Sequence, residues 1–324
     1  MAVKSQTETS DNTNSEMLTT LTAPPYLKPG DTVAIVAPSG LLKNRYREIE
    51  QAKSLLKEWG LHAIVGEHVF SKSGHFAGTD EQRASDLQQA MDNPNVKAIW
   101  CARGGYGTVR VLDLLDYSKF RAQPKWLIGY SDITALHNDI HNLGIETIHA
   151  LMCTSLTADI TEVETAISSF RKGIFGEDIG YSIVGSSFNK PGTASGQIVG
   201  GNLTLLHTML GSRSSIHTDG KILFFEEIGE YEYHIDRMLQ SMKRAGYFKN
   251  LKGVVVGSIS KVRENTTPWG KPVEQLIRDV FDEYNIPILF DFPAGHEKDN
   301  RALILGRTIT MDVGKETSTL TFKN

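Results

Sequence analysis

The sequence predicts an α/β protein in which a domain built on a parallel sheet is followed by a second domain. From Asp31 onward, short runs rich in β-branched residues alternate with segments whose apolar residues recur at helical spacing, as in parallel strands joined by helices. Between Tyr181 and Gly200 glycine, serine and threonine dominate, and Pro191-Gly192 interrupts the chain. We therefore expect a flexible tail over 1–22, an N-terminal domain over 23–160, a linker region over 161–192 and a C-terminal domain over 193–324.

The first half is expected to alternate strands and helices. The strands are expected at 32–37, 62–66, 96–102, 125–130 and 146–150. The helices are expected near 49–59, 80–91, 109–115, 132–142 and 161–175. Ligands of open α/β sheets bind beyond the carboxyl ends of the strands, so the residues that follow these strands are the first candidates for a site.

The second half shows a similar mixture and then a hairpin. Its strands are expected at 221–226, 254–259, 286–290 and 302–306, and its helices near 202–210, 232–245 and 272–283. The last segment, 307–322, is expected to form a closing hairpin.

Composition excludes several classes of protein. Among 324 residues, 34 Lys plus Arg stand against 38 Asp plus Glu, so the net charge of -4 predicts no nucleic-acid partner and no membrane partner. No apolar run is long enough to span a bilayer, and the polar first 22 residues lack the apolar stretch of a secretory signal. We therefore expect a cytoplasmic protein in which Cys101 and Cys153 are reduced, buried thiols.

The strongest local signal is Gly129-Tyr130-Ser131-Asp132, which follows an expected buried strand and begins a helix. A serine at such a turn exposes its hydroxyl, and the next backbone N–H points toward an oxyanion formed there. The alternative is a structural one, because serine is also a good helix N-cap.

A second signal is the loop Arg103-Gly104-Gly105-Tyr106-Gly107, which follows another expected parallel strand. Adjacent glycines let the backbone approach a ligand and aim N–H groups at a carbonyl oxygen or an anion. The loop does not match the dinucleotide-binding pattern of glycines, and a plain turn before a helix is the alternative.

Two further side chains have the chemistry of partners for a serine nucleophile. Glu226 ends an expected strand, with Glu227 beside it, and His296 lies in the loop that follows another strand. A histidine can act as general base to a serine when a carboxylate holds its other nitrogen. Taken singly, an exposed histidine and a solvated carboxylate are the alternatives.

Several residues are weaker candidates for substrate binding. Gly201 and Asn202 precede a helix and could present N–H groups to a carboxylate, although Asn202 is also a good N-cap. Arg237 and Arg301 could hold an anion, although surface salt bridges are the commoner role of arginine.

Two histidines on one expected helix could form part of a metal site. His137 and His141 share a helix face, but Asn138 stands where the zinc peptidase motif has glutamate, and no third ligand is near in sequence. We expect no metal and no cofactor.

Taken together, these stretches resemble the LD-carboxypeptidase family, the serine peptidases that include muramoyltetrapeptide carboxypeptidase and the microcin C self-immunity proteins. The resemblance runs from Leu27 to Thr321. It is carried by VAIVAPSG, AGTDEQRASDL, AIWCARGGYGTVRVLDLLD, LIGYSDITALH, GGNLTLL, LFFEEIGE and PAGH, in that order. A departure is the pair Ala150-Leu151, where family members tend to have glycine and proline; we expect this pair to line the cleft.

The resemblance implies a fold and a mechanism. It implies a flavodoxin-like N-terminal domain, a smaller β-rich α/β C-terminal domain and a homodimer. It implies a catalytic triad of Ser131, Glu226 and His296, with Glu227 as the neighbouring alternative to Glu226. The oxyanion hole would be the backbone N–H of Asp132 with one from Gly104-Gly105.

The implied reaction is removal of the terminal D-alanine from a murein tetrapeptide during peptidoglycan recycling. The free carboxylate of this substrate would need a cationic pocket or one rich in N–H groups, for which Arg103, Arg237 and the Gly200-Gly201-Asn202 turn are the candidates. A second possibility within the same chemistry is hydrolysis of an aminoacyl-nucleotide amide, as in microcin C self-immunity, with Trp100 or Trp269 to stack on the base. A third is a binding module without turnover, which the retained serine, glutamate and histidine disfavour.

Overall fold

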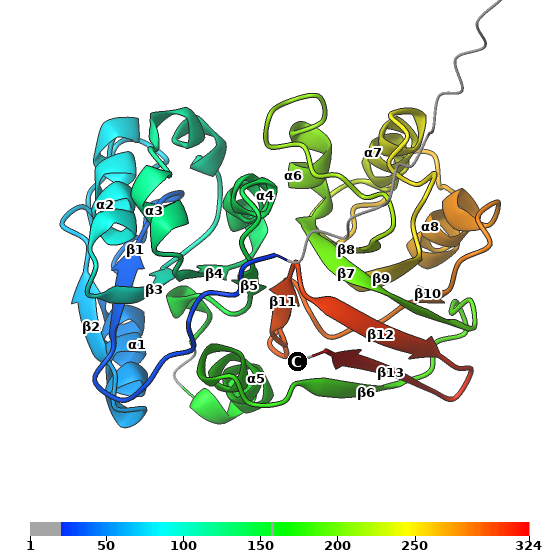
Figure 1. Cartoon of the computed structure of the whole chain (residues 1–324). Helices are drawn as coiled ribbons and strands as arrows, with labels where there is room; N and C mark the ends of the chain where they lie inside the picture. The colour runs from blue at the N-terminus through cyan, green and yellow to red at the C-terminus, as the bar shows by residue number, and fades with distance from the viewer. Residues whose placement is uncertain (1–20, 157–158, 324) are drawn as a thin grey trace, which may run out of the picture.

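Two sheets organise the chain and lie side by side (Figure 1). The structure is a computed structural model, and it describes residues 21–156 and 159–323. The predicted tail over 1–22 lies almost entirely outside the described residues.

The first sheet has the strand order β11-β5-β4-β3-β1-β2. Strands β1 to β5 are parallel and follow the 2-1-3-4-5 order of flavodoxin-like folds, as expected. Their bounds are Thr32–Val36 for β1, His62–Val65 for β2, Val96–Cys101 for β3, Trp126–Gly129 for β4 and Thr147–His149 for β5.

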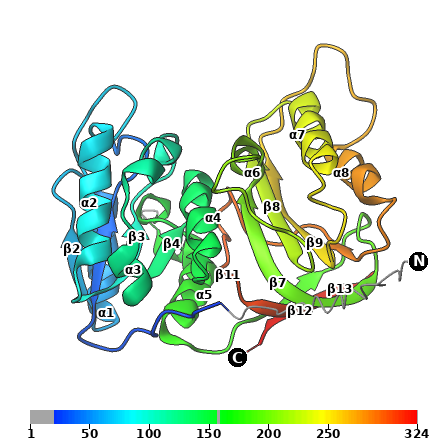
Figure 2. The ribbon, with the colours of Figure 1, turned by 45° about the horizontal axis from the view of Figure 1, so that its top comes forward.

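Helices cover both faces of this sheet, because successive side chains of a strand point to opposite faces. In β1, Val33 and Ile35 pack in the core with α1, whereas Ala34 and Val36 pack in the core with α2 and α4. Figures 1 and 2 show α2, α3 and α4 on one face, and Figure 1 shows α1 and α5 on the other. The helices are α1 (Tyr46–Glu58), α2 (Asp80–Asp92), α3 (Ser118–Ala122), α4 (Thr134–Asn142) and α5 (Glu164–Phe175).

One expected helix of this domain takes a different form. The segment 109–115 forms two 3₁₀ turns, Thr108–Arg110 and Leu112–Leu114, before α3 begins. The β-branched residues Thr108, Val109 and Val111 favour an α-helix less than straight-chain residues do.

The second sheet has the order β10-β9-β8-β7-β12-β13-β6, with β7 to β10 parallel and the other neighbours antiparallel. Its strands are β6 (Gly180–Val184), β7 (Gly192–Asn202), β8 (Ile222–Ile228), β9 (Gly253–Ser260), β10 (Ile288–Leu289), β12 (Thr308–Val313) and β13 (Thr317–Phe322). Its helices are α6 (Leu203–Thr208), α7 (Glu232–Arg244) and α8 (Val273–Phe281). The closing hairpin is confirmed as β12 and β13.

The linker expected over 161–192 is largely ordered structure. It contains α5 and the edge strand β6, and β7 starts at its end. Neither strand was predicted, because glycine and serine within them have low strand propensity and are typical of loops.

One strand of the C-terminal half belongs to the first sheet. Strand β11 (Leu303–Leu305), which was expected in the second domain, pairs antiparallel with β5. Next to it, the buried guanidinium of Arg307 makes hydrogen bonds to both carboxylate oxygens of Glu146, at 3.1 and 3.2 Å from Nε. The C-terminal segment therefore connects the two halves of the chain by a strand pairing and an ion pair.

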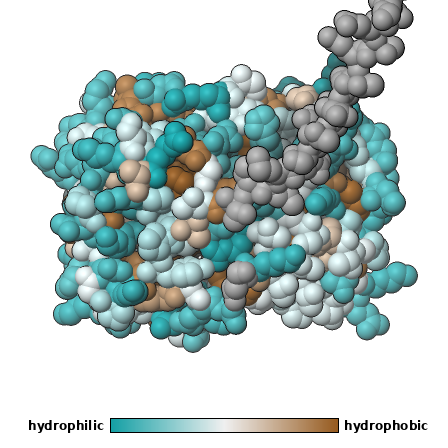
Figure 3. Space-filling view, in the orientation of Figure 1, coloured by the Kyte–Doolittle hydropathy of each residue, from teal (hydrophilic) through white to brown (hydrophobic). Residues whose placement is uncertain are grey.

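The surface and the two cysteines can be compared with the sequence. The face in Figure 3 is mostly hydrophilic, with apolar residues in small groups. Among the described residues, no helix has both the length and the apolar character required to cross a bilayer. Cys101 and Cys153 are confirmed as free, buried thiols, and burial raises the pKa of both.

Candidate active site

The turn after β4 places Ser131 in a strained backbone conformation. Its φ is +63°, in the left-handed region that non-glycine residues avoid at a cost of about 1–2 kcal/mol. Gly129 allows the turn to be tight, because a Cβ there would lie 2.9 Å from Ile133. Ser131 is not the N-cap of α4, since that position is Ile133. The strained turn and the half-buried side chain of Ser131 match a nucleophile elbow better than a cap.

His296 connects Ser131 to Glu226. Its Nε2 lies 3.0 Å from Ser131 Oγ, and its Nδ1 lies 2.7 Å from Glu226 Oε2. The Glu226 carboxylate accepts from Nδ1–H, so Nε2 is free to accept the serine proton. Glu226 is fully buried and His296 is only 16% exposed, which shields the pair from water. The three residues that the sequence suggested are thus a hydrogen-bonded chain.

The pleat of β8 decides between the two adjacent carboxylates, since neighbouring side chains point to opposite faces. Glu226 faces His296, whereas Glu227 accepts from the N–H and the hydroxyl of Thr204, each at 2.7 Å. Burial raises the pKa of Glu227. The Asn202 amide donates to both carboxylates, at 3.2 Å in each case. Glu227 therefore holds the start of α6 and Asn202, not the histidine.

Two residues that sequence reasoning missed support the histidine loop. Asn300 Oδ1 accepts from Gly295 N–H at 2.8 Å and lies 3.2 Å from His149 Nε2. Gly295 has a φ of +125°, and a Cβ there would lie 2.8 Å from Glu226 Oε2. Only glycine lets the loop lie this close to the carboxylate. No local pattern could reveal Asn300 or His149, because the contact joins residues 151 positions apart.

The glycine loop lies against Ser131. A Cβ on Gly104 would be 3.0 Å from Ser131 Cβ and 3.2 Å from its Oγ. Gly105 has a φ of +106°, which glycine adopts without cost. The loop and the Asp132 turn are therefore adjacent, as an oxyanion hole built from both would require.

The glycine-asparagine turn predicted to bind substrate lies at the junction of the domains. A Cβ on Gly201 would lie 2.4 Å from Thr134 Oγ1, so glycine is needed for the end of β7 to approach α4. The N–H of Asn202 donates to the same Thr134 oxygen at 2.9 Å. Asn202 also caps α6 by accepting from Leu205 N–H. The side chain and the N–H of Asn202 are therefore both engaged in hydrogen bonds within the protein.

The three candidate arginines lie in different surroundings. The guanidinium of Arg103 is half-buried and donates to the Leu41 carbonyl. Arg237 is exposed on α7 and lies over the Tyr233 ring, 5.3 Å from its centroid. Arg301 is paired with Asp299. Of these, Arg103 lies in the loop that contacts Ser131.

The histidine pair on α4 has structural partners. His137 accepts from Thr147 Oγ1 at 2.8 Å and donates to the Gly129 carbonyl at 2.9 Å, so both of its ring nitrogens are occupied. His141 Nε2 accepts from Lys221 at 2.9 Å. Within residues 21–156 and 159–323, no group of three or more His, Cys, Asp or Glu side chains is arranged to hold a metal ion.

The buried histidines predict a loss of stability in mild acid. Burial lowers the pKa of His137 to about 4 and those of His141 and His149 to about 3. The unfolded chain, with histidine pKa values near 6.5, binds these protons first. The free energy of unfolding should therefore fall as pH drops from 6.5 toward 4, by up to about 1.4 kcal/mol per histidine and pH unit. The raised pKa values of Glu227 and Glu297 oppose this, but as two groups against three.

Urea unfolding measured between pH 7 and pH 4 checks this expectation. The variant His137→Gln should show a slope smaller by one proton in the same pH range. A free energy of unfolding that is constant or rises as the pH falls would contradict the assignment.

Comparison with known proteins gives a consistent picture. The family models for the LD-carboxypeptidase N-terminal and C-terminal domains match residues 33–150 and 195–311. A probable murein peptide carboxypeptidase of Bacillus subtilis is 34% identical, over 92% of this chain and 93% of the relative. The crystal structure of muramoyltetrapeptide carboxypeptidase from Oxalobacter formigenes is similar with a TM-score of 0.81 at 27% identity, over 90% of this chain and 99% of that one. An MccF-like protein from Bacillus anthracis gives 0.82 at 26% identity, over 94% and 100%.

Proposed function

Because this chain belongs to the LD-carboxypeptidase family of serine peptidases, we propose that it removes the terminal D-alanine from a murein tetrapeptide. The observation that supports this most directly is the hydrogen-bonded chain from Ser131 Oγ through His296 to the buried Glu226 carboxylate. The names of the relatives, which refer to murein peptides and to muramoyltetrapeptide, support the substrate class.

In the first half of the proposed reaction, Ser131 Oγ attacks the carbonyl carbon of the scissile amide while His296 Nε2 accepts the serine proton. The carbonyl oxygen becomes an oxyanion next to the Asp132 N–H and the glycine loop. Collapse of this intermediate breaks the C–N bond, and His296 gives its proton to the leaving nitrogen of D-alanine.

In the second half, water attacks the acyl-enzyme with His296 again as the base, and Ser131 recovers its proton. Glu226 keeps its negative charge throughout and stabilises the imidazolium that forms twice per cycle. Arg103 is the residue we propose for the free carboxylate of the substrate, because its loop contacts Ser131.

The same proposal includes a homodimer that acts in the cytoplasm on peptides recovered from the cell wall.

The similarity to the MccF-like protein supports a second candidate, the hydrolysis of an aminoacyl-nucleotide amide. The predicted base-stacking residues do not favour it. Trp100 is fully buried in β3, and Trp269 packs against the core of the second domain. Ala150 and Leu151, expected to line the cleft, are buried as well.

A substrate panel analysed by mass spectrometry tests the proposal. Purified protein is incubated with L-Ala-γ-D-Glu-meso-diaminopimelate-D-Ala, with the same peptide ending in L-Ala, and with an aminoacyl-nucleotide amide. A Ser131→Ala preparation serves as the blank for contaminating peptidases. Loss of one alanine from the D-Ala peptide alone is the expected result. Cleavage of the nucleotide amide alone would replace the murein substrate by the second candidate, and no cleavage of any substrate would overturn both.

A further inference from the structure

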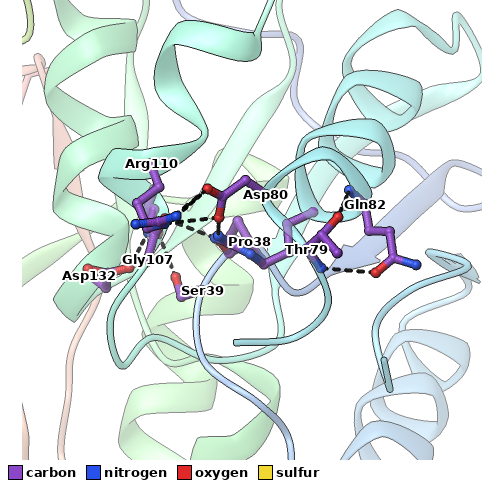
Figure 4. A network of polar contacts seen from close by, with 10 residues as sticks. Pro38, Ser39, Thr79, Asp80, Gln82, Gly107, Arg110 and Asp132 are labelled. Atoms are coloured by element: carbon purple, nitrogen blue, oxygen red, sulfur yellow. Dashed lines mark hydrogen bonds and ion pairs between the residues drawn. The ribbon is translucent and has the colours of Figure 1, made fainter. Parts of the chain in front are cut away.

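A buried polar network lies behind the glycine loop and joins three turns of the first sheet (Figure 4). The turns follow β1, β3 and β4, and they contribute Pro38 and Ser39, Gly107 and Thr108, and Asp132. The side chain of Arg83, on α2, lies between the turns that follow β1 and β3. None of these side chains has a role in the proton transfers described above.

Arg83 holds two of the turns by their carbonyl oxygens. Its Nη1 donates to the Gly107 carbonyl at 2.9 Å and also to the Pro38 carbonyl. The side chain is only 1% exposed, and its charge is balanced by Asp80, which also pairs with Arg110. A buried cation costs free energy through lost hydration, so its position between two loop carbonyls requires a reason beyond the packing of α2.

Local structure sets this position of Arg83. A capping box between Thr79 and Gln82 fixes the first turn of α2, one residue before Arg83 (Figure 4). Gly107 has a φ of +133°, and a Cβ there would lie 3.0 Å from Arg83 Nη1. Glycine at 107 therefore gives the guanidinium direct access to the carbonyl.

Asp132 ties the same loop to the nucleophile turn. Its fully buried carboxylate accepts from Thr108 N–H at 2.8 Å, and the Thr108 hydroxyl lies 2.5 Å from that of Ser39. At the other end of the loop, Gly40 N–H donates to the Gly104 carbonyl at 3.1 Å. In a trans peptide the N–H points away from the C=O, so this bond also fixes the direction of the Gly105 N–H.

We propose that Arg83 and the Asp132 carboxylate are positioning residues that set the spacing between the two donors of the oxyanion hole. One donor is the N–H of Asp132 itself, and the other belongs to the loop that Arg83 and Asp132 hold. Donors must lie about 2.7–3.1 Å from the oxyanion, and a displacement of about 1 Å costs on the order of 10²-fold in rate. The inference rests on the proposed function, because it assigns a role within that reaction.

The variant Arg83→Lys tests the proposal, with Arg110→Gln as its matched control. Lysine keeps the charge near Asp80 but cannot reproduce the forked guanidinium. We expect Arg83→Lys to lower kcat about 10²-fold with KM within about twofold. Arg110 bonds to Asp80 and to neither loop carbonyl, so Arg110→Gln should leave kcat within about twofold.

Two further readouts separate positioning from general damage to the fold. A peptide aldehyde, which forms a tetrahedral adduct with Ser131, should bind Arg83→Lys about 10²-fold more weakly, in step with kcat. The uncleaved tetrapeptide should bind Ser131→Ala and Ser131→Ala/Arg83→Lys with equal Kd. A kcat equal to that of wild type, or an equal weakening of aldehyde and substrate binding, would overturn the proposal.

The Asp132 contact gives a second, independent pair of variants should Arg83→Lys fail to fold. Asp132→Asn keeps an acceptor for Thr108 N–H and Asp132→Ala does not, so kcat of the asparagine variant should exceed that of the alanine variant at least tenfold. Equal kcat values for the two variants would contradict the role of the carboxylate.

A labelling experiment on Ser131 distinguishes an error in the positioning role from an error in the proposed function. If wild type cleaves no substrate of the panel, the rate at which a fluorophosphonate phosphonylates Ser131 is measured by intact mass instead. That rate also depends on the oxyanion hole, so it should fall for Arg83→Lys and not for Arg110→Gln. Equal labelling of wild type and Arg83→Lys would refute the positioning role whatever the natural substrate is.

Discussion

Replacing Ser131 by alanine is expected to lower kcat for alanine release about 10⁶-fold, the loss typical of removing the nucleophile from a serine triad. The reason is geometric, because His296 Nε2 lies 3.0 Å from Ser131 Oγ and would have no other proton to accept. Binding should survive, since the missing hydroxyl takes part mainly in bond formation. Alanine release followed by mass spectrometry and tetrapeptide Kd measured by calorimetry give the two quantities.

Ser155→Ala is the matched control for this variant. Ser155 accepts from the Met152 N–H and makes no hydrogen bond to His296, so its loss should change kcat by no more than about threefold. A Ser131→Ala enzyme that retains a tenth or more of the wild-type kcat would rule out the serine mechanism.

Glu226→Gln is expected to lower kcat about 10⁴-fold without a comparable change in KM. An amide carries no charge to stabilise the imidazolium, and its NH₂ group can turn toward His296 Nδ1 and select the wrong tautomer. The double variant Ser131→Ala/Glu226→Gln should be no slower than Ser131→Ala alone, because the triad acts as a unit.

Glu227→Gln separates the two neighbouring carboxylates. Both oxygens of Glu227 accept hydrogen bonds, from Asn202 and the Ile228 N–H on one side and from Thr204 on the other, so the amide should lower the stability of the protein. None of these partners is His296, so kcat should stay within about tenfold of wild type. If kcat falls about 10⁴-fold in Glu227→Gln and not in Glu226→Gln, the assignment of Glu226 is wrong.

The elements that the sequence predicted well are those whose signal is local. The β-branched strands of the first sheet and the helices α1, α2, α7 and α8 were found at nearly their observed bounds. Strand β7 was missed because Gly196, Gly200 and Gly201 reduce its strand propensity, although each is needed where the backbone approaches a neighbour closely. The sheet to which β11 belongs depends on a distant partner, which no local pattern specifies.

The candidate site also contains residues that have a local sequence signal and residues that have none. The serine turn and the glycine loop have short sequence patterns that imply a particular backbone geometry, so they could be proposed from the sequence. The choice between Glu226 and Glu227 depends on which face of β8 meets His296, and only the three-dimensional arrangement gives it. Asn300, Arg83 and the Asp132 carboxylate make hydrogen bonds to residues 24 or more positions away in the sequence, so their sequence neighbourhoods carry no sign of these roles.

The pairing of β11 with β5 has a consequence for how the chain acquires its structure during synthesis. The N-terminal sheet leaves the ribosome with β5 as an open edge, and the segment that covers this edge follows roughly 150 residues later. Until then, unpaired N–H and C=O groups on β5 offer a template to other chains. Completion of the N-terminal domain thus waits for nearly the whole polypeptide, and a serine turn formed early still lacks Glu226 and His296. A nascent or truncated chain therefore holds the proposed nucleophile without the residues proposed to activate it.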